Sequence, residues 1–291
     1  MIYYYEHKPM SDMPAEEINL LGFNGIKDYS LKHGIDPQTV FDVIKKLEND
    51  IKNLNQSQID ITSPENFELL NKWVNFYIEY FNRFATFKKQ AYIIIGNIAS
   101  GKSTLAKDLE EATKSIIVDP DKFKMGEQTD SGFFEGLTSL YQKPTDRELM
   151  QDACSTACKM TLENISNLGM NLIMPKAATS LEKLERQLKR LQEKNYDIHL
   201  ILIDAPISDC ADRNYYRYLI KEYEGSSFPT PSTKTHGRFV PVSVITNIGD
   251  SPYETFVRAV KSNNGFRFKS FNAFYNSNSQ KNEEIDIKTM Q

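Results

Sequence analysis

The chain has 291 residues, of which 40% are hydrophobic and 25% charged, and its formal net charge is −4. This length predicts one large or two modest domains with enough chain for a hydrophobic core. The acidic balance argues against general binding to nucleic acid or to an anionic membrane. No apolar run is long enough to span a bilayer, and the first residues lack the pattern of a secretory signal. We therefore expect a cytoplasmic protein, acting either in the cell that makes it or after delivery into another.

Residues 1–88 are predicted to be all helical. Three stretches carry apolar residues at helical spacing, near 14–33, 36–54 and 63–84. The second opens with Asp36 and Pro37, an N-cap residue followed by a first-turn proline. Because the links between the helices are short, we expect a small antiparallel bundle.

From residue 90 onward, short β-branched runs alternate with helical stretches. Such alternation is typical of crossover units in an α/β protein, a mostly parallel sheet with helices on both faces. The division expected is a helical region at 1–88, an α/β domain at 89–275 and a flexible tail at 276–291. The expected strands are 92–95, 115–118, 171–174, 198–203 and 267–274, and the expected helices are 102–112, 145–167, 180–194, 207–223 and 241–262.

A phosphate-binding loop lies between the first strand and the first helix of this domain. Residues 96–104 read Gly-Asn-Ile-Ala-Ser-Gly-Lys-Ser-Thr, which satisfies the pattern G-x-x-x-x-G-K-[ST]. Glycines let successive backbone N–H groups converge on phosphate oxygens, and the following helix contributes its positive end. Lys102 would reach the β- and γ-phosphates, and Ser103 would ligate Mg²⁺. The candidate nucleotide-binding residues are Gly96, Asn97, Ala99, Ser100, Gly101, Lys102, Ser103 and Thr104. The expected nucleotide is ATP, with GTP as the alternative.

Two carboxylates follow the second strand, at the edge of the sheet where ligands of parallel sheets collect. Asp119 or Asp121 could take a proton from a substrate hydroxyl, which makes one of them a candidate general base. The alternative is that these residues only cap the next helix.

Phosphoryl transfer also requires positive charge, often from arginine, because negative charge builds on the migrating group. Arg213 and Arg217 are four residues apart on the helix 207–223 and therefore share a face. Arg238 follows a loop at 224–237, rich in Gly, Ser, Thr and Pro, that is typical of a lid. We expect Arg217 and Arg238 to act at the site; a surface ion pair is the alternative for each arginine.

The order of these motifs resembles the zeta-toxin family of P-loop kinases over about residues 90–275. Residues 96–104 correspond to the family's phosphate loop, and Asp119 to Lys124 resemble its Asp-x-Asp-x-Phe-Lys segment, in which the second acid, here Asp121, is the catalytic base. The strand 171–174 is similar to the one before the family's substrate-contacting turn. Arg217, eleven residues after Ala205-Pro206, and Arg238, within 237–241, match the arginines that contact nucleotide phosphates.

The resemblance implies an Mg·ATP-dependent kinase of the toxin–antitoxin type, which phosphorylates a hydroxyl of a nucleotide-type small molecule such as UDP-N-acetylglucosamine or NAD. One departure concerns the acceptor. Where the family commonly has Glu-Gly-Thr after the third strand, this chain has Pro175-Lys176-Ala177, without the carboxylate or the hydroxyl. A site that selects hydroxyls by hydrogen bonds loses selectivity when these partners are missing.

The resemblance also implies a protein partner. Family systems include a small three-helix antitoxin that blocks the nucleotide site, so an inhibitor is expected either in trans or in cis, through residues 1–88. The alternative for 1–88 is a scaffold. Two other functions fit the phosphate loop: a polynucleotide end-kinase, against which the charge of −4 argues, and a catalytically degenerate nucleotide-binding regulatory protein, with which Pro175-Lys176-Ala177 is consistent.

Overall fold

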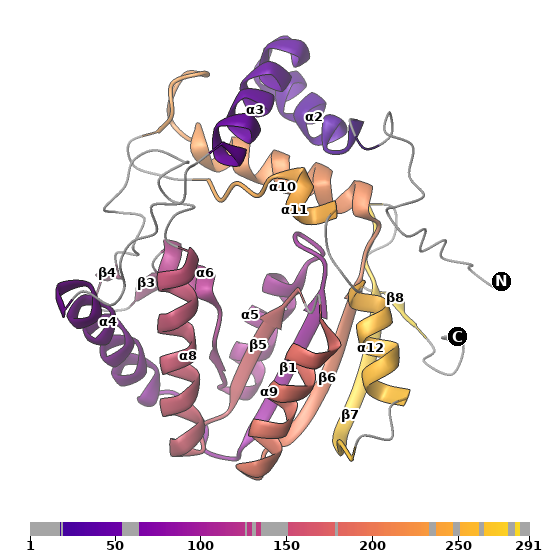
Figure 1. Ribbon diagram of the computed structural model, residues 1–291. Helices are drawn as coiled ribbons and strands as arrows, with labels where there is room; N and C mark the ends of the chain where they lie inside the picture. The colour runs from indigo at the N-terminus through magenta and orange to yellow at the C-terminus, as the bar shows by residue number, and fades with distance from the viewer. Residues whose placement is uncertain are drawn as a thin grey trace.

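The computed structural model describes residues 18, 20–53, 64–125, 127–129, 132–134, 151–177, 180–232, 237–246, 251–261, 265–278 and 283–285. Its centre is a six-stranded sheet with the order β2-β5-β1-β6-β7-β8, in which every pairing is parallel except that of β7 with β8 (Figure 1). The strands of this sheet are β1 (Gln90–Gly96), β2 (Ile116–Ile117), β5 (Leu172–Lys176), β6 (Asp197–Asp204), β7 (Phe268–Tyr275) and β8 (Glu283–Glu284). A separate antiparallel pair comprises β3 (Glu127–Thr129) and β4 (Gly132–Phe134).

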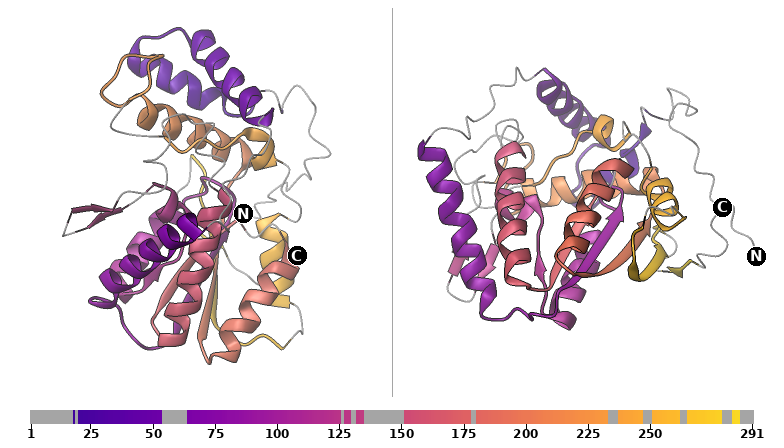
Figure 2. Two further views of the ribbon diagram at one scale, coloured as in Figure 1. Left: turned by 60° about the vertical axis from the view of Figure 1, so that its left-hand side comes forward. Right: turned by 60° about the horizontal axis from the view of Figure 1, so that its bottom comes forward.

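Helices cover both faces of the sheet, which explains why its central strands are apolar at successive positions. Neighbouring residues of β1 enter different cores: Ile93 packs with residues of α8 and α9, whereas Ile94 packs with α5. The two views of Figure 2 show the layers from other sides. The helices of the α/β part are α5 (Lys102–Thr113), α6 (Pro120–Met125), α8 (Gln151–Leu168), α9 (Leu181–Glu193), α10 (Ile207–Glu222), α11 (Val242–Thr246) and α12 (Pro252–Lys261).

Three N-terminal helices are present as expected, but they do not pack as one bundle. They are α2 (Phe23–His33), α3 (Pro37–Lys52) and α4 (Pro64–Asn82). In Figure 1, α4 lies beside α8, and its residues Leu70, Val74 and Tyr77 join the core of the sheet layer. In contrast, α2 and α3 lie over α10 and share a second core with it. The apolar stripe of α4 thus packs on α8, whereas the stripes of α2 and α3 pack on each other and on α10.

The expected α/β fold is confirmed, and the expected strands lie within one or two residues of β1, β2, β5, β6 and β7. The stretch 241–262 differs: it contains two helices, α11 and α12, and residues 247–250 between them lie outside the described part. The first residues of the helix expected at 145–167 also lie outside it. No helix in the described ranges combines the length and apolar character that a bilayer crossing requires.

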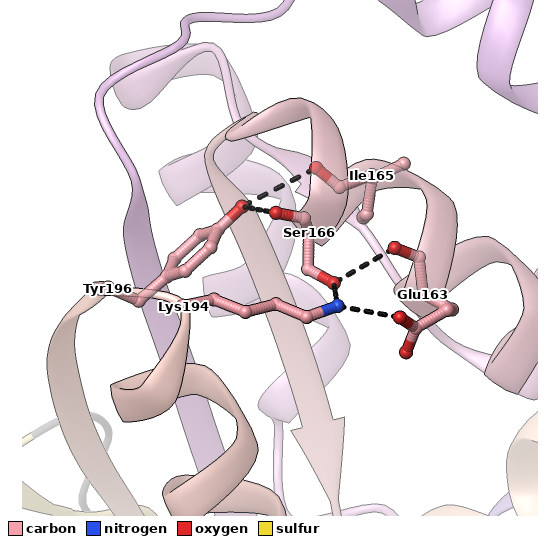
Figure 3. A network of polar contacts seen from close by, with 5 residues as sticks. All are labelled: Glu163, Ile165, Ser166, Lys194 and Tyr196. Carbon is pink, nitrogen blue, oxygen red and sulfur yellow. Dashed lines mark hydrogen bonds and ion pairs between the residues drawn. The ribbon is translucent and has the colours of Figure 1, made fainter.

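A polar network ties α8 to the amino-terminal edge of the sheet (Figure 3). The Lys194 ammonium donates to the Glu163 carboxylate at 2.8 Å and to the Ser166 hydroxyl at 2.7 Å. The buried Tyr196 hydroxyl, just before β6, donates to the Met170 carbonyl at 2.8 Å. Burial raises the pKa of Tyr196 to about 12, so this group remains a donor at neutral pH.

We expect Tyr196→Phe to lower the free energy of unfolding by about 1–2 kcal/mol, because a buried carbonyl loses its donor while the ring packing is kept. Lys194→Met should cost less, about 0–1 kcal/mol, since its partner Glu163 is largely exposed. Urea denaturation of both variants measures the difference. Equal losses would contradict the importance assigned to the buried hydroxyl.

Candidate active site

The loop between β1 and α5 is shaped by two glycines. Gly101 has a φ of 110°, and a Cβ atom placed there would lie 2.5 Å from the Asn276 amide nitrogen. A Cβ at Gly96 would approach the Ile203 carbonyl and lie 2.7 Å from the Ser100 hydroxyl oxygen. Ala99 also has a positive φ of 59°. The chain can therefore make this tight turn only with glycine at the two fixed positions of the motif.

Lys102 is the first residue of α5 and its side chain folds back over the loop. Its ammonium donates to the carbonyls of Gly96 at 2.9 Å and Asn97 at 2.6 Å. Burial and the nearby Arg238 lower the pKa of Lys102 to about 8, although Cys210 and the nearby acids partly oppose the shift. The loop thus holds a cation that is mostly charged at neutral pH and that a bound anion would stabilise further.

A pocket of about 490 Å³ lies at the carboxyl-terminal edge of the sheet, above this loop. Its walls come from the loop and the start of α5, the segment after β2, the end of β5, α10, and the segment that carries Arg238. This position is where parallel α/β sheets bind ligands. The sequence-predicted residues that line it are Ala99, Gly101, Lys102, Ser103, Thr104, Asp119, Asp121, Arg213, Arg217 and Arg238.

The two acids have different surroundings. The Asp119 carboxylate accepts a hydrogen bond of 3.0 Å from the backbone N–H of Asp121 and so caps α6. Burial and the adjacent Asp121 raise the pKa of Asp119 to about 6, although Arg238 and Lys102 oppose the shift. Asp121 instead forms an ion pair with the Arg238 guanidinium across the pocket. Asp119 therefore has a structural role at the start of α6. Asp121 pairs instead with the long side chain of Arg238, which can change its position.

The three arginines reach the pocket from α10 and from the segment after the loop at 224–237. Arg217 is accessible to solvent through the pocket, yet the surrounding walls, together with Arg238, lower its pKa. Arg213 is tied more firmly, because it donates to the Asn276 carbonyl at 3.2 Å and to the Asn278 side chain at 2.9 Å. Residues 233–236 of the expected lid lie outside the described residues.

Asn276 belongs to the site although sequence reasoning placed it in the tail. Its side-chain amide donates to the Ser100 carbonyl at 2.6 Å, and its backbone N–H donates to the Asp204 carbonyl at 2.8 Å. It also lines the pocket. The signal that could have found it is its position directly after a parallel strand, since carboxyl ends of strands collect ligand-binding groups.

The donor set fits a magnesium ion that travels with a nucleotide. Within the described ranges, no three His, Cys, Asp or Glu side chains are grouped closely enough to hold a metal by themselves. Ser103 is exposed and lines the same pocket as Asp119 and Asp121. Mg²⁺ typically takes one or two protein ligands and completes its shell with phosphates and water.

Fold and site together define an α/β protein with a P-loop kinase architecture. The family model described as "Zeta toxin" matches residues 80–280, which is more than half of the chain. This chain therefore belongs to the zeta-toxin family. No curated protein matches it.

Several solved structures align with this chain. A chain from the PezAT chromosomal toxin–antitoxin system of Streptococcus pneumoniae aligns with 16% identity and a TM-score of 0.50, over 76% of this chain and 80% of that one. The complex of AvrRxo1-ORF1 with AvrRxo1-ORF2 aligns with 13% identity and a TM-score of 0.48, over 76% of this chain and 66% of that one. The same complex with ATP aligns with 14% identity and a TM-score of 0.45, over 75% of this chain and 64% of that one. At 16% identity, the alignment with the PezAT chain indicates a shared fold only.

The lowered pKa of Lys102 predicts proton uptake when ATP binds. With a pKa of about 8, Lys102 is about half charged at pH 8, and a bound triphosphate stabilises the charged form. Calorimetry of Mg·ATP binding at pH 8 in buffers of different ionisation enthalpy should show about half a proton more uptake for the wild type than for Lys102→Arg, whose guanidinium is always charged. Equal uptake by both proteins would contradict this.

Proposed function

We propose that this protein is an Mg·ATP-dependent kinase that transfers the γ-phosphoryl group to a hydroxyl of a nucleotide-type small molecule. The observation that carries the proposal is one pocket in which Lys102, Asp121 and three arginine side chains converge beside a phosphate-binding loop. A nucleotide-binding protein without catalysis needs the loop and its lysine. It has no need of a carboxylate facing the same pocket.

In this proposal the amides of residues 96–104 and the Lys102 ammonium hold the β- and γ-phosphates. The Ser103 hydroxyl would hold Mg²⁺, which, when bound with the nucleotide, offsets negative charge on these phosphates. Arg217 and Arg238 would stabilise the charge that develops on the transferred group, each contributing on the scale of about 3–4 kcal/mol known for single preorganised donors. GTP remains an alternative nucleotide, because no described contact distinguishes the bases.

Asp121 is the proposed general base. In the structure its carboxylate is paired with Arg238. Phosphate oxygens would compete for this guanidinium with a higher charge and a matching geometry, which would release the carboxylate toward the acceptor. Asp121 would then take the hydroxyl proton as the acceptor oxygen attacks the γ-phosphorus and ADP leaves.

The structure around Lys176 favours an acceptor that carries negative charge. Lys176 ends β5, next to the pocket-lining Pro175, and burial lowers its pKa. Within the described ranges its ammonium makes no hydrogen bond or ion pair, although Asp119 is near enough to stabilise its charge. A half-buried cation of this kind is best satisfied by an anionic ligand. UDP-N-acetylglucosamine and NAD are acceptors of this class because each carries a diphosphate.

We further propose that the activity is toxic in a cytoplasm that contains the acceptor, and that an antitoxin protein restrains it. The similar fold from a toxin–antitoxin system supports this partner. The α/β domain is proposed to span 89–275, although Asn276 and Asn278 hydrogen-bond to Ser100 and Arg213 of the site and β8 extends the sheet beyond that boundary.

We expect Asp121→Asn to reduce phosphoryl transfer by about 10²–10⁴-fold with ATP binding retained. The asparagine side chain has the same size as aspartate but cannot accept the proton of the acceptor hydroxyl. Asp119→Asn is the matched control: its amide oxygen still caps α6, so transfer should fall less than tenfold. Incubation with ATP, Mg²⁺ and a metabolite extract, followed by mass spectrometry for species heavier by one phosphate, measures both. Full activity of Asp121→Asn with an inactive Asp119→Asn would assign the base to Asp119.

A second prediction concerns the acceptor. Lys176→Met should raise the KM for a diphosphate-containing acceptor by about 10–100-fold, since a hydrogen bond to a charged group is lost, while the KM for ATP stays unchanged. Lys189→Met, at an exposed position of α9, is the control and should change neither value. Equal KM values for the acceptor in Lys176→Met and wild type would remove Lys176 from the acceptor site.

A further inference from the structure

The helices α2 and α3 form an element, here called the α2–α3 pair (residues 23–52), that precedes the family-matched region 80–280. It nevertheless packs against α10, the helix that carries Arg213 and Arg217, as the upper part of Figure 1 shows. The shared core is apolar and buried: Ile26, Tyr29, Val40 and Ile44 from the pair lie with Tyr215, Tyr218, Leu219 and Val240.

The contact between α2 and α10 is close because a glycine lies at the crossing. A Cβ atom at Gly25 would lie 2.7 Å from the carbonyl carbon of Asp212, so no side chain fits there without a shift of the backbone. The Asp212 carboxylate of α10 accepts hydrogen bonds from two groups of α2, the Gly25 N–H at 3.3 Å and the Asn24 amide at 3.2 Å. Asp212 is adjacent to Arg213, and thus α2 is bonded to the part of α10 that faces the pocket.

Glu48 of α3 joins three elements. One of its carboxylate oxygens accepts from the Tyr215 hydroxyl of α10 and, at 3.0 Å, from the backbone N–H of Val242 at the start of α11. The other oxygen pairs with Lys45 at 2.9 Å. Glu48 therefore fixes the end of the segment 237–242, which carries Arg238.

The same segment is anchored to α10 at two more points. The Gly237 N–H donates to the buried Glu222 carboxylate at 2.8 Å, and the Asn214 side-chain amide donates to the Val240 carbonyl at 2.8 Å. Arg238 is thus held on both sides, and Glu48 supplies an anchor that comes from outside the family-matched region.

From these contacts we propose that the α2–α3 pair is a positioning element: through Glu48 and Gly25 it holds α10 and the segment 237–242 so that Arg217 and Arg238 face the phosphate-binding loop. The inference rests on the proposed function for its consequence in catalysis, but its structural part does not. No described residue of the pair lines the pocket, so it acts through α10 and segment 237–242. If the α2–α3 pair were an inhibitor in cis, weakening its contacts would raise the activity. Because it is proposed as a positioning element, weakening its contacts should lower the activity.

The first experiment needs no ligand. Hydrogen exchange of the full chain is compared for wild type, Glu48→Ala, and Asp50→Ala, an exposed acid on the same helix. Glu48→Ala should speed exchange at the amides of 237–242 by about tenfold and leave β1 and β6 unchanged, because one anchor of this segment is removed. Glu48→Gln keeps an oxygen that accepts from Val242 and should restore slow exchange. Unchanged exchange in 237–242 for Glu48→Ala would overturn the inference.

The second experiment separates positioning from general stability. Affinity for Mg·ATP is measured by calorimetry for Glu48→Ala, Arg238→Ala and the double variant. Glu48→Ala should weaken binding by about tenfold in the wild-type background and less than twofold in the Arg238→Ala background, because its effect passes through that arginine. Equal losses in both backgrounds would reduce the pair to a structural role. If the wild type binds no ATP, the proposed function fails, and the exchange experiment alone decides the structural part.

Discussion

The site depends on one constraint: several like charges must share a pocket before any phosphate is present. Burial lowers the pKa values of Lys102 and Arg217, and the nearby Arg238 lowers both as well. The structure balances them with backbone carbonyls around Lys102 and with the Asp121 carboxylate on Arg238. A triphosphate would replace these partners. The arrangement therefore couples two events, the capture of the phosphates and the release of the proposed base.

Keeping such charges in place requires rigid elements behind them. The loop is fixed by two glycines and by Asn276, which bonds to the Ser100 carbonyl. On the other side of the pocket, α10 makes most of its described contacts with α2 and α11 rather than with the sheet. Its outer face is covered by α2 and α3, which build a second core there. Two cores thus face each other across the pocket, and Arg238 with Asp121 bridges them.

Much of the fold and of the loop could be predicted from sequence, because both follow local rules. Strand and helix periodicity located β1, β5, β6 and α10, and the phosphate-loop pattern located Gly96 to Thr104 in a single step. The partners of the N-terminal helices could not be predicted in this way. An apolar stripe shows that a helix is buried, but it does not show which element covers the stripe. That α4 packs on α8, and α2 on α10, depends on contacts between residues far apart in the sequence. Asn276 was missed for a related reason, since its role arises from its approach to Gly101, far away in sequence.

The most direct test of the account is a crystal structure of the protein with Mg²⁺ and a non-hydrolysable ATP analogue. We predict that the Arg238 guanidinium leaves Asp121 and contacts the γ-phosphate. Lys102 should turn from the Gly96 and Asn97 carbonyls to the β- and γ-phosphates. The Asp121 carboxylate should then face open space where an acceptor hydroxyl fits. Phosphates bound on the loop while Arg238 stays paired with Asp121 would contradict the account.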